Sequence, residues 1–308
     1  MTRRRSGRAV NGWVVVDKPL GLTSIQVVAR VRRILDPRKI GHGGTLDPLA
    51  TGLLPIAMGE ATKTVPYLVD GQKSYRFTVR WGERTETDDA EGEVVETSDK
   101  RPSEPEIRAV LGRFVGEVEQ VPPNFSAIKV AGRRAYEKAR AQEVFELRPR
   151  RVDIHRLELL ATEGPDLASF EADCGKGTYM RALARDLGTA LGTHAHVVAL
   201  RRTAVGPFGE EDAISLESLE ALGHSAAASE ALLPIETALD DIPALALSET
   251  EANRLRCGQA VSMLARVNRD RIREFENGAI VYATLGGRPV ALARYESGDI
   301  HPVRVLNL

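Results

Sequence analysis

The sequence predicts an α+β fold, with a mixed sheet and helices followed by a small β-rich module. Two observations point to this class. Segments of alternating apolar and polar residues are interspersed with two amphipathic helix patterns, and short strand-like segments joined by glycine turns fill the C-terminal end. A chain of 308 residues, 43% hydrophobic and 28% charged, is long enough for one large domain and one small domain. We expect the larger domain at 1–247 and the smaller at 248–308.

The N-terminal part is predicted to form a strand, a helix and then more strands. Gly12 to Asp17 is a typical strand. Thr23 or Ser24 is expected to cap the first helix. Its apolar side is predicted to carry Ile25, Val28, Val31 and Leu35. Strand-like alternation returns at 74–81, 150–160 and 168–174.

A second helix is predicted after Gly177, and glycine at 188 or 192 is its expected stop. The apolar side of this helix is expected to carry Tyr179, Met180, Leu183, Leu187 and Leu191. A strand at 196–204 and an acidic helical linker follow. The C-terminal module is predicted to contain a helix at 248–255 and strands at 279–285, 289–295 and 301–306.

Composition excludes several classes of protein. The N-terminus is basic but no apolar run follows it, and no stretch approaches the length of a membrane helix, so we expect a cytoplasmic protein. Cys174 and Cys257 are far apart, which excludes a disulfide framework, and we expect both to be buried. His194 and His196 share one strand face, but no third ligand lies nearby in the sequence. We therefore expect neither a metal nor another cofactor.

Charge is segregated along the chain although the net charge is only −1. The stretch 129–151 carries eight basic residues against three acidic ones, which makes it a candidate phosphate-binding face. The alternative is a solvated helix on which Glu137 pairs with Lys138 and Arg140. Two other stretches, 83–99 and 210–251, are strongly acidic, and we expect them to face away from any nucleic acid.

The most informative segment is the irregular run GHGGTLDPLATG at 41–52. Asp47 precedes a proline, which disfavours helix, and the four glycines allow positive φ and close approach to a ligand. Such a loop presents a carboxylate on a stiff corner. The alternative is that Asp47 only caps the next element, because Asp before Pro is ordinary turn chemistry.

This run resembles the signature GHxGTLDPxATG of the TruB family of bacterial tRNA pseudouridine-55 synthases, with Gly43 in the variable position. The resemblance extends over the full chain. It implies isomerisation of uridine 55 in the tRNA T-loop, without metal or guide RNA. It also implies a pseudouridine synthase fold, with a mixed, largely antiparallel sheet flanked by helices, and a C-terminal PUA-like RNA-binding domain.

The resemblance implies that Asp47 is the catalytic nucleophile. Its attack on C6 of uracil or on C1′ of ribose remains open at this point. Because a dry pocket raises the pKa of a carboxyl, a cationic neighbour is needed to keep Asp47 ionised. Arg181, in KGTYMRALARDLG, matches the family arginine that pairs with this aspartate, and Tyr179 matches a residue lining the uridine site. Without the resemblance, Arg181 would be taken for a surface helix residue.

Four further positions receive roles from the family. Tyr75 is expected to stack on the target base and to help deprotonate C5, and Leu200 to form an apolar floor. His42 is expected to fill the space left by the flipped base, and Lys18 to support the active-site loop. Residue type alone would make Tyr75 and Leu200 core residues and His42 a solvated loop residue.

The segment PPNFSAIKVAGRRAY, in the expected insertion at 122–151, resembles the family's RNA-gripping region. Lys129, Arg133 and Arg134 are predicted to contact phosphates, with Asn124 and Phe125 near the pocket, and the region is expected to be mobile without RNA. We expect a monomer that binds the tRNA T-arm.

Rival functions are less well supported by the sequence. No GxSxG, GK[ST] or PCxxC motif occurs, which argues against a serine hydrolase, a P-loop enzyme and a zinc deaminase. An RNA-guided pseudouridylase shares the aspartate loop and the tail but depends on partner proteins and a guide. A non-catalytic RNA-binding protein would be indifferent to loss of Asp47.

Overall fold

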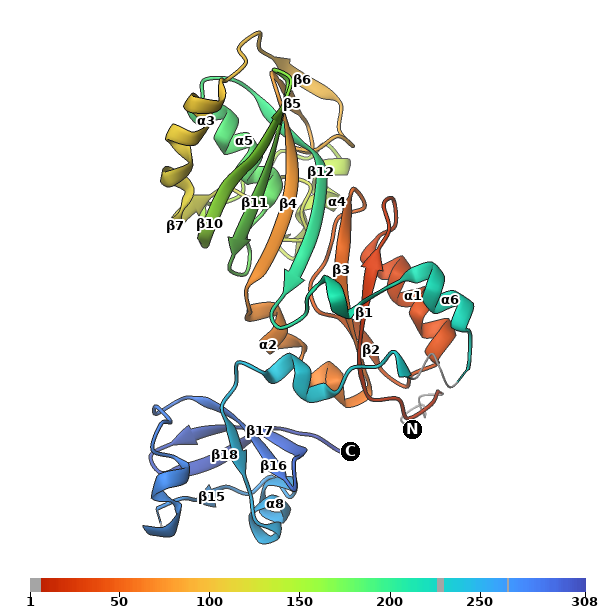
Figure 1. The fold of residues 1–308 in the computed structure, drawn as a ribbon, viewed down its shortest axis with the longest axis vertical. Coiled ribbons are helices and arrows are strands. Elements are labelled where there is room, and N and C mark those ends of the chain that lie inside the picture. Colours follow the sequence, from red (N-terminus) through yellow and green to blue (C-terminus); the bar gives the residue numbers. More distant parts are fainter. Residues whose placement is uncertain (1–6, 226–229, 265) are drawn as a thin grey trace.

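The computed structural model describes residues 7–225, 230–264 and 266–308, so the basic residues at the very N-terminus lie outside it. Figure 1 shows an upper body built on a large sheet and a lower body built on a smaller sheet. The large sheet has nine strands in the order β13-β1-β3-β12-β4-β11-β10-β7, with β2 added beside β3. The predicted α+β class is confirmed.

Six of the eight neighbouring strand pairs in the large sheet are antiparallel, which confirms the predicted mixed, largely antiparallel sheet. The parallel pairs are β1 with β13 and β3 with β12. The strands are β1 (Gly12–Lys18), β2 (Ile40–His42), β3 (Ala50–Met58), β4 (Lys73–Trp81), β7 (Gly116–Gln120), β10 (Arg150–Glu163), β11 (Leu167–Cys174), β12 (Ala195–Val205) and β13 (Ala213–Ser215).

Helices and small hairpins surround this sheet. The α-helices are α1 (Ser24–Leu35), α2 (Val65–Asp70), α3 (Glu104–Leu111), α4 (Ala135–Arg140), α5 (Met180–Ala190) and α6 (Leu216–Leu222). The 3₁₀ helices are η1 (Gly59–Lys63), η2 (Gly112–Phe114), η3 (Glu210–Asp212) and η4 (Ile235–Leu239). The hairpins are β5 (Glu83–Thr85) with β6 (Val94–Thr97) and β8 (Lys129–Val130) with β9 (Arg133–Arg134).

Helix α1 begins as predicted, and Val28, Val31 and Leu35 of its predicted apolar side pack on the core, but Ile25 does not. Thr23 is its N-cap and forms a capping box with Gln26. Ile25, predicted to be on the apolar side, is 68% exposed, whereas Val27, Val31, Ile34 and Leu35 are buried. The cause is Ser24, whose hydroxyl exchanges hydrogen bonds of 3.0 and 2.8 Å with the backbone of Leu46. This contact fixes the rotation of the helix and ties it to the loop that carries Asp47.

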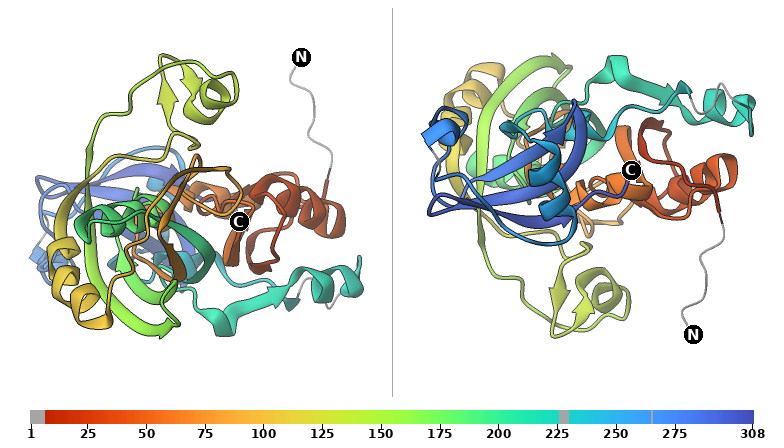
Figure 2. Two further views of the ribbon diagram at one scale, coloured as in Figure 1. Left: turned by 90° about the horizontal axis from the view of Figure 1, so that it is seen from above. Right: turned by 90° about the horizontal axis from the view of Figure 1, so that it is seen from below.

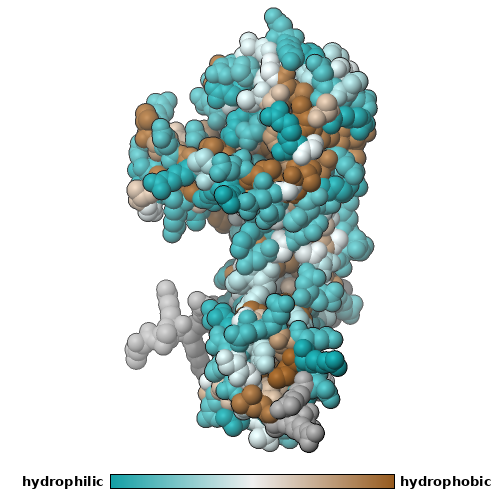
Figure 3. Space-filling model, turned by 90° about the vertical axis from the view of Figure 1, so that its left-hand side faces the viewer, coloured by the Kyte–Doolittle hydropathy of each residue, from teal (hydrophilic) through white to brown (hydrophobic). Residues whose placement is uncertain are grey.

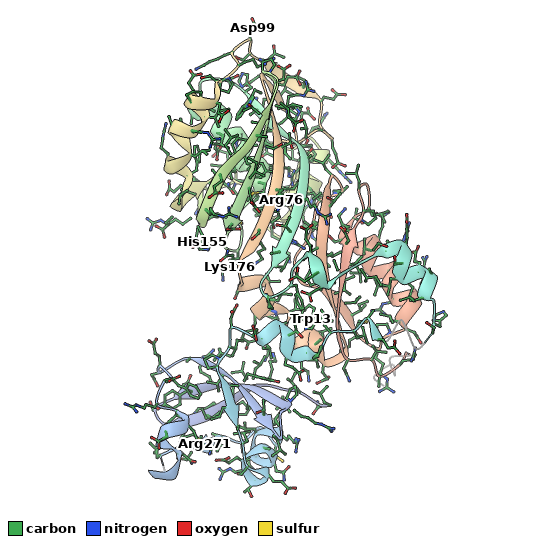
Figure 4. The ribbon with its side chains drawn as sticks, viewed as in Figure 1. Trp13, Arg76, Asp99, His155, Lys176 and Arg271 are labelled. Atoms are coloured by element: carbon green, nitrogen blue, oxygen red, sulfur yellow. The ribbon has the colours of Figure 1, made fainter. Side chains whose placement is uncertain are left out.

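In the half of the large sheet formed by β4, β11 and β10, α3 and α5 cover one face (Figure 1). Phe77 and Phe170 stack between the sheet and the helices, with ring centroids 5.4 Å apart. On the opposite face, Arg76, labelled in Figure 4, pairs with Glu171 at 3.6 Å, and Arg156 pairs with Asp173 at 2.7 Å. In the other half, β1 and β3 are buried on both faces, by α1 on one side and by residues of α2 and η4 on the other.

Two expectations were wrong in this part of the chain. The acidic segment after residue 210 is not only a helical linker, because β13 within it pairs in parallel with β1 in the large sheet. Cys174 is buried, as expected, but Cys257 is exposed. Cys257 directly follows a helix whose C-terminal end is solvated, so a small apolar side chain there has no core to enter.

The smaller sheet has the order β14-β16-β17-β18-β15. Its elements are β14 (Ala244–Ala246), α8 (Glu249–Arg256), β15 (Val261–Ser262), η5 (Arg266–Arg271), β16 (Ile280–Leu285), β17 (Arg288–Glu296) and β18 (Asp299–Val305). The predicted helix and three strands are all present, and Ser248 caps α8. β14 belongs to this sheet although it lies just before residue 248. The module has its own core, formed around Leu255, Val281 and Val290.

The end of the chain returns to the large body. Leu306 is 3% exposed and packs in a cluster with Trp13 and Phe208. Lys63 donates a hydrogen bond of 2.7 Å to the Val305 carbonyl, and the Asn307 N–H donates one of 2.7 Å to Glu60. We call this contact of residues 305–307 with the large body the C-terminal latch.

Two surface features are relevant to function. The β8–β9 hairpin and α4 project from the body as a separate lobe in Figure 2, and Figure 3 shows a largely hydrophilic surface. We call the segment 122–151, which contains this projection, the lobe. Among the described residues, no helix has the length and apolarity needed to cross a membrane.

The latch predicts a measurable difference between two leucines near the C-terminus. Leu306→Ala should lower the free energy of unfolding by about 2–4 kcal/mol, because it leaves a cavity beside Trp13. Leu308→Ala is the matched control, since Leu308 is 61% exposed. Its effect should stay within about 0.5 kcal/mol in urea denaturation. Equal effects of the two substitutions would contradict the packing of the latch.

Candidate active site

The run that carries Asp47 is fixed at both ends by strands. His42 ends β2 and Ala50 begins β3, so only 43–49 is irregular. Gly44 and Gly52 take positive φ, at 113° and 95°, whereas the other two glycines of the run do not. The element after Asp47 is a strand, which removes the helix-capping alternative. The loop is therefore a short, firmly held bridge between two strands of the sheet.

Asp47 lies against Arg181, with Oδ2 and Nη2 2.8 Å apart. Arg181 is 4% exposed and comes from the first turn of α5. Its guanidinium also donates to the carbonyls of Thr87 and Phe125, each at 3.0 Å. Arg181 thus connects the Asp47 loop with the β5–β6 hairpin and with the base of the lobe.

The ionisation of Asp47 is set by opposing effects. Burial raises its pKa most strongly, the Arg181 guanidinium lowers it, and the Asp89 carboxylate raises it again. The net direction of the pKa is upward. Arg181 is therefore the counter-charge that favours the ionised form of Asp47 against burial.

Two acidic residues of this site were missed in the sequence. Asp89 lies 3.4 Å from Arg181, and Asp88 pairs with Arg185 at 2.9 Å. Both carboxylates are buried at the site, so this pair does not belong to the solvated acidic surface of 83–99 that is expected to face away from nucleic acid. No local pattern could have found them, because their partners lie more than 90 residues away in the chain.

Lys18 is fully buried beneath the loop. Its ammonium donates to the carbonyls of Pro19, Leu22 and Pro48 at 2.9, 2.6 and 3.3 Å. Burial lowers the pKa of Lys18 to about 8, although Asp47 and Glu91 oppose the change. By holding the carbonyl next to Asp47, Lys18 fixes the end of β1 to the loop.

Three ring side chains lie at the loop, in surroundings that disfavour the charged form of each. Burial, with Arg202 second, lowers the pKa of His42, and burial raises the pKa values of Tyr75 and Tyr179. The side-chain amide of Gln120 holds the backbone of Tyr179: its Nε2 donates to the Tyr179 carbonyl at 3.1 Å, and its Oε1 accepts from the Tyr179 N–H at 2.8 Å. Uncharged rings that surround a carboxylate suit a flat, neutral base as ligand.

Leu200 is buried in β12, where it pairs with Ala50 at the exit of the loop and with Phe77 on β4. The structure therefore places it in the core beneath the loop. An apolar side chain at this depth can both complete the core and limit how far a planar ligand enters.

The basic residues of the lobe are not gathered at Asp47. Lys129, Arg133 and Arg134 lie exposed on the β8–β9 hairpin, which stands away from the body (Figure 2). Arg133 pairs with Glu143 at 2.6 Å, so the ion pairs of this stretch differ from those expected around Glu137. The lobe reaches the site only at its base, where the Phe125 carbonyl meets Arg181.

A metal centre is not indicated by the residues that the structure describes. Across 7–225, 230–264 and 266–308, no cluster of three or more His, Cys, Asp or Glu side chains could hold an ion. His196 is buried with Nδ1 3.0 Å from the Glu83 carbonyl, and His194 lies 3.6 Å from Glu96. These two histidines therefore have partners within the protein.

Comparisons with known proteins identify the family of the chain. Residues 32–180 match the N-terminal domain of the TruB family pseudouridylate synthases, and 181–240 match the C-terminal domain of tRNA pseudouridylate synthase B. A tRNA pseudouridine synthase B of Rhodospirillum rubrum is 56% identical over 308 residues, covering 100% of both chains. That of Bradyrhizobium diazoefficiens is 56% identical and covers 99% of this chain and 88% of its own.

Solved structures with the same fold come from larger assemblies. A chain of a Cbf5-Nop10-Gar1 complex is 27% identical with a TM-score of 0.74, covering 96% of this chain and 85% of its own. A chain of an H/ACA RNP bound to a substrate RNA is 25% identical with a TM-score of 0.74, covering 100% and 92%.

The charge balance at Asp47 can be tested by carbon-13 NMR of its carboxyl group, assigned through Asp47→Asn. We expect its pKa to lie above the ordinary range of aspartate and to rise further in Arg181→Met, because the counter-charge is removed. Arg185→Met is the matched control, since Arg185 pairs with Asp88 and Asp186. A lower Asp47 pKa in Arg181→Met would refute the pairing.

Proposed function

Because this chain belongs to the TruB family of pseudouridylate synthases, we propose that it converts uridine 55 in the T-loop of tRNA to pseudouridine without a guide RNA. The observation that carries the proposal is the contact of 2.8 Å between Asp47 and Arg181, formed in a signature loop that is fixed on both sides. Relatives 56% identical over the whole chain support the choice of tRNA as substrate.

Isomerisation requires that the N1–C1′ bond breaks, the base turns, and C5 bonds to C1′. Asp47 acts as the nucleophile at C6 or at C1′, or assists a glycal intermediate, and Arg181 stabilises its negative charge. The product gains a proton at N1 and loses one at C5, so no co-reactant is needed. The Tyr75 hydroxyl is the oxygen proposed to help remove the C5 proton.

The target base must leave its stack before Asp47 can reach it. A neutral His42 fills the vacated space, and its polar ring suits a place in a base stack. Tyr179 lines the uridine site, Leu200 limits its depth and Lys18 holds the loop in place. These roles follow the family resemblance and are compatible with the burial of each side chain.

RNA binding is divided between two regions. The lobe presents Lys129, Arg133 and Arg134 to phosphates of the T-arm, and the C-terminal module provides a second contact. We propose that the large body is the catalytic unit and that the smaller body is a PUA-like RNA-binding unit, whose first strand, β14, moves the boundary a few residues before the expected 248. The enzyme would act as a monomer in the cytoplasm.

A second candidate is an RNA-guided pseudouridylase, which the TM-scores of 0.74 to chains of a Cbf5-Nop10-Gar1 complex and an H/ACA RNP favour. The identity to those chains is about half that to the tRNA pseudouridine synthase B relatives, so we prefer the guide-free interpretation. Activity of the purified chain alone separates the two candidates.

The deciding experiment maps pseudouridine by chemical labelling and primer extension in an unmodified tRNA transcript. Purified protein alone should give one stop, at uridine 55. Asp47→Asn should abolish the stop while tRNA binding stays within a few fold, because it keeps the shape but removes the nucleophile. Asp99→Asn is the control, since Asp99 is exposed and far from the site (Figure 4).

Retention by Asp47→Asn of more than about a hundredth of the wild-type rate would exclude a nucleophilic role. Absence of any stop with wild-type protein would favour the guided alternative. A stop at another uridine would keep the chemistry but remove the assigned position.

The lobe can be tested through the salt dependence of tRNA binding. Reversing Arg133 and Arg134 to Glu should weaken binding and reduce the slope of log K against log[salt] by roughly one for each phosphate that is no longer neutralised. Arg108→Glu, which changes an exposed arginine paired with Glu104 on α3, is the control and should leave the slope unchanged. An unaltered slope in the double variant would remove the lobe from the RNA interface.

A further inference from the structure

Arg202 is a buried cation with an unusual set of partners. It is 1% exposed, and the hydrogen bonds that the described residues offer its side chain come from backbone carbonyls and not from a carboxylate. Its Nε donates to the Leu53 carbonyl at 2.8 Å and its Nη2 to the Gly44 carbonyl at 3.1 Å. A buried charge without a counter-ion opposes folding, so packing alone does not explain an arginine here.

Tyr75 is the neighbour of Arg202 across two strands. The two residues are directly paired across β12 and β4, so their side chains project from the same face of the sheet. Burial raises the pKa of the Tyr75 hydroxyl most strongly, and the nearby Arg202 guanidinium lowers it. Arg202 therefore binds the loop that carries Asp47 and lies beside the tyrosine proposed to serve C5.

Two glycines of the loop leave room for this arrangement. A Cβ at Gly44 would lie 3.2 Å from Nη1 of Arg202, and a Cβ at Gly52 would lie 2.2 Å from its carbonyl oxygen. Side chains at these positions would push the arginine and the loop apart. The absence of a side chain at Gly44 and Gly52 is thus what lets Arg202 lie directly against the loop.

We propose that Arg202 is a positioning residue, whose guanidinium holds the Tyr75 hydroxyl at a fixed place relative to the Gly44 carbonyl of the Asp47 loop. This inference rests on the proposed function. The planar guanidinium has several N–H donors, so it can bind the Asp47 loop and Tyr75 on β4 at the same time. This keeps the distance between the tyrosine oxygen and the aspartate constant while the base turns between them. Arg202 itself touches no reacting atom.

Arg201 is a natural control on the same strand. Its side chain lies on the opposite face, where it pairs with Asp17 at 2.9 Å and Glu210 at 2.7 Å, and it is half-exposed. It pairs across β12 and β4 with Arg76, on the polar face of the sheet. Arg201→Met therefore removes one positive charge from the same strand, β12, without altering the site.

The test compares Arg202→Met, Arg202→Lys and Arg201→Met in single-turnover reactions with tRNA. Arg202→Met should slow pseudouridine formation by about a hundredfold, the effect that removal of one preorganised donor gives, with tRNA affinity within about threefold. Arg202→Lys should remain at least about tenfold slow, because an ammonium cannot span both partners. Arg201→Met should resemble wild type.

The kinetic isotope effect at C5 of the uridines is a readout that a mere loss of protein stability would not change. In Arg202→Met the ratio of the rate with hydrogen at C5 to the rate with deuterium should exceed that of wild type, because loss of the C5 proton becomes slower. An unchanged ratio, a rate like that of wild type, or full rescue by Arg202→Lys would overturn the proposal. If Arg202→Met does not fold, Arg202→Lys provides the same readouts.

A measurement independent of activity separates this inference from the proposed function. With 3-fluorotyrosine incorporated, the fluorine signal of residue 75 is assigned by its loss in Tyr75→Phe. Arg202→Met should raise the pKa of this phenol, because the guanidinium favours its ionised form. An unchanged titration would overturn the Arg202–Tyr75 contact, whereas an inactive wild-type enzyme would overturn the proposed function alone.

Discussion

The site depends on one constraint: the carboxylate of Asp47 has to be ionised although its loop is partly buried. Asp47 meets this constraint through Arg181, and the same guanidinium collects backbone carbonyls from two other segments. A single planar group with five donors can do this, whereas an ammonium could not hold the same directions. The three segments that Arg181 joins, namely the Asp47 loop, the β5–β6 hairpin and the base of the lobe, are thus held in place by the residue that balances one charge.

Backbone carbonyls, more than carboxylates, satisfy the other buried cations. Lys18 donates to three carbonyls, Arg202 to two, and Lys73 to those of Val69 and Gly71 at the end of α2. Burial lowers the pKa of Lys73 to about 8, as it does for Lys18. These contacts fix loops without adding negative charge near Asp47, so the positive side chains shape the backbone and leave the site open to an anionic ligand.

Local patterns in the sequence predicted many of the elements. Thr23 is one of the two caps expected for α1, and the strands predicted by alternation are all present. The central strand β3 was not predicted, because it is buried along nearly its whole length and so shows no alternation of apolar and polar residues. The Asp47 loop and Arg181 were found through a family motif, since composition gave no reason to pair residues so far apart. Where the prediction failed, as for Ile25 and Asp89, the missing information was the partner across space, namely Leu46 for α1 and Arg181 for the hairpin.

The C-terminal latch has a consequence for the mechanics of the molecule. Relative motion is the ordinary expectation for two bodies that are joined by a single linker. Here the smaller body is attached to the large one twice, by the chain that leads into β14 and again by residues 305–307, where Leu306 packs in the cluster of Trp13 and Lys63 binds the Val305 carbonyl. The second attachment restricts rotation of the smaller body about the first, so the two sheets move together more than one linker would require.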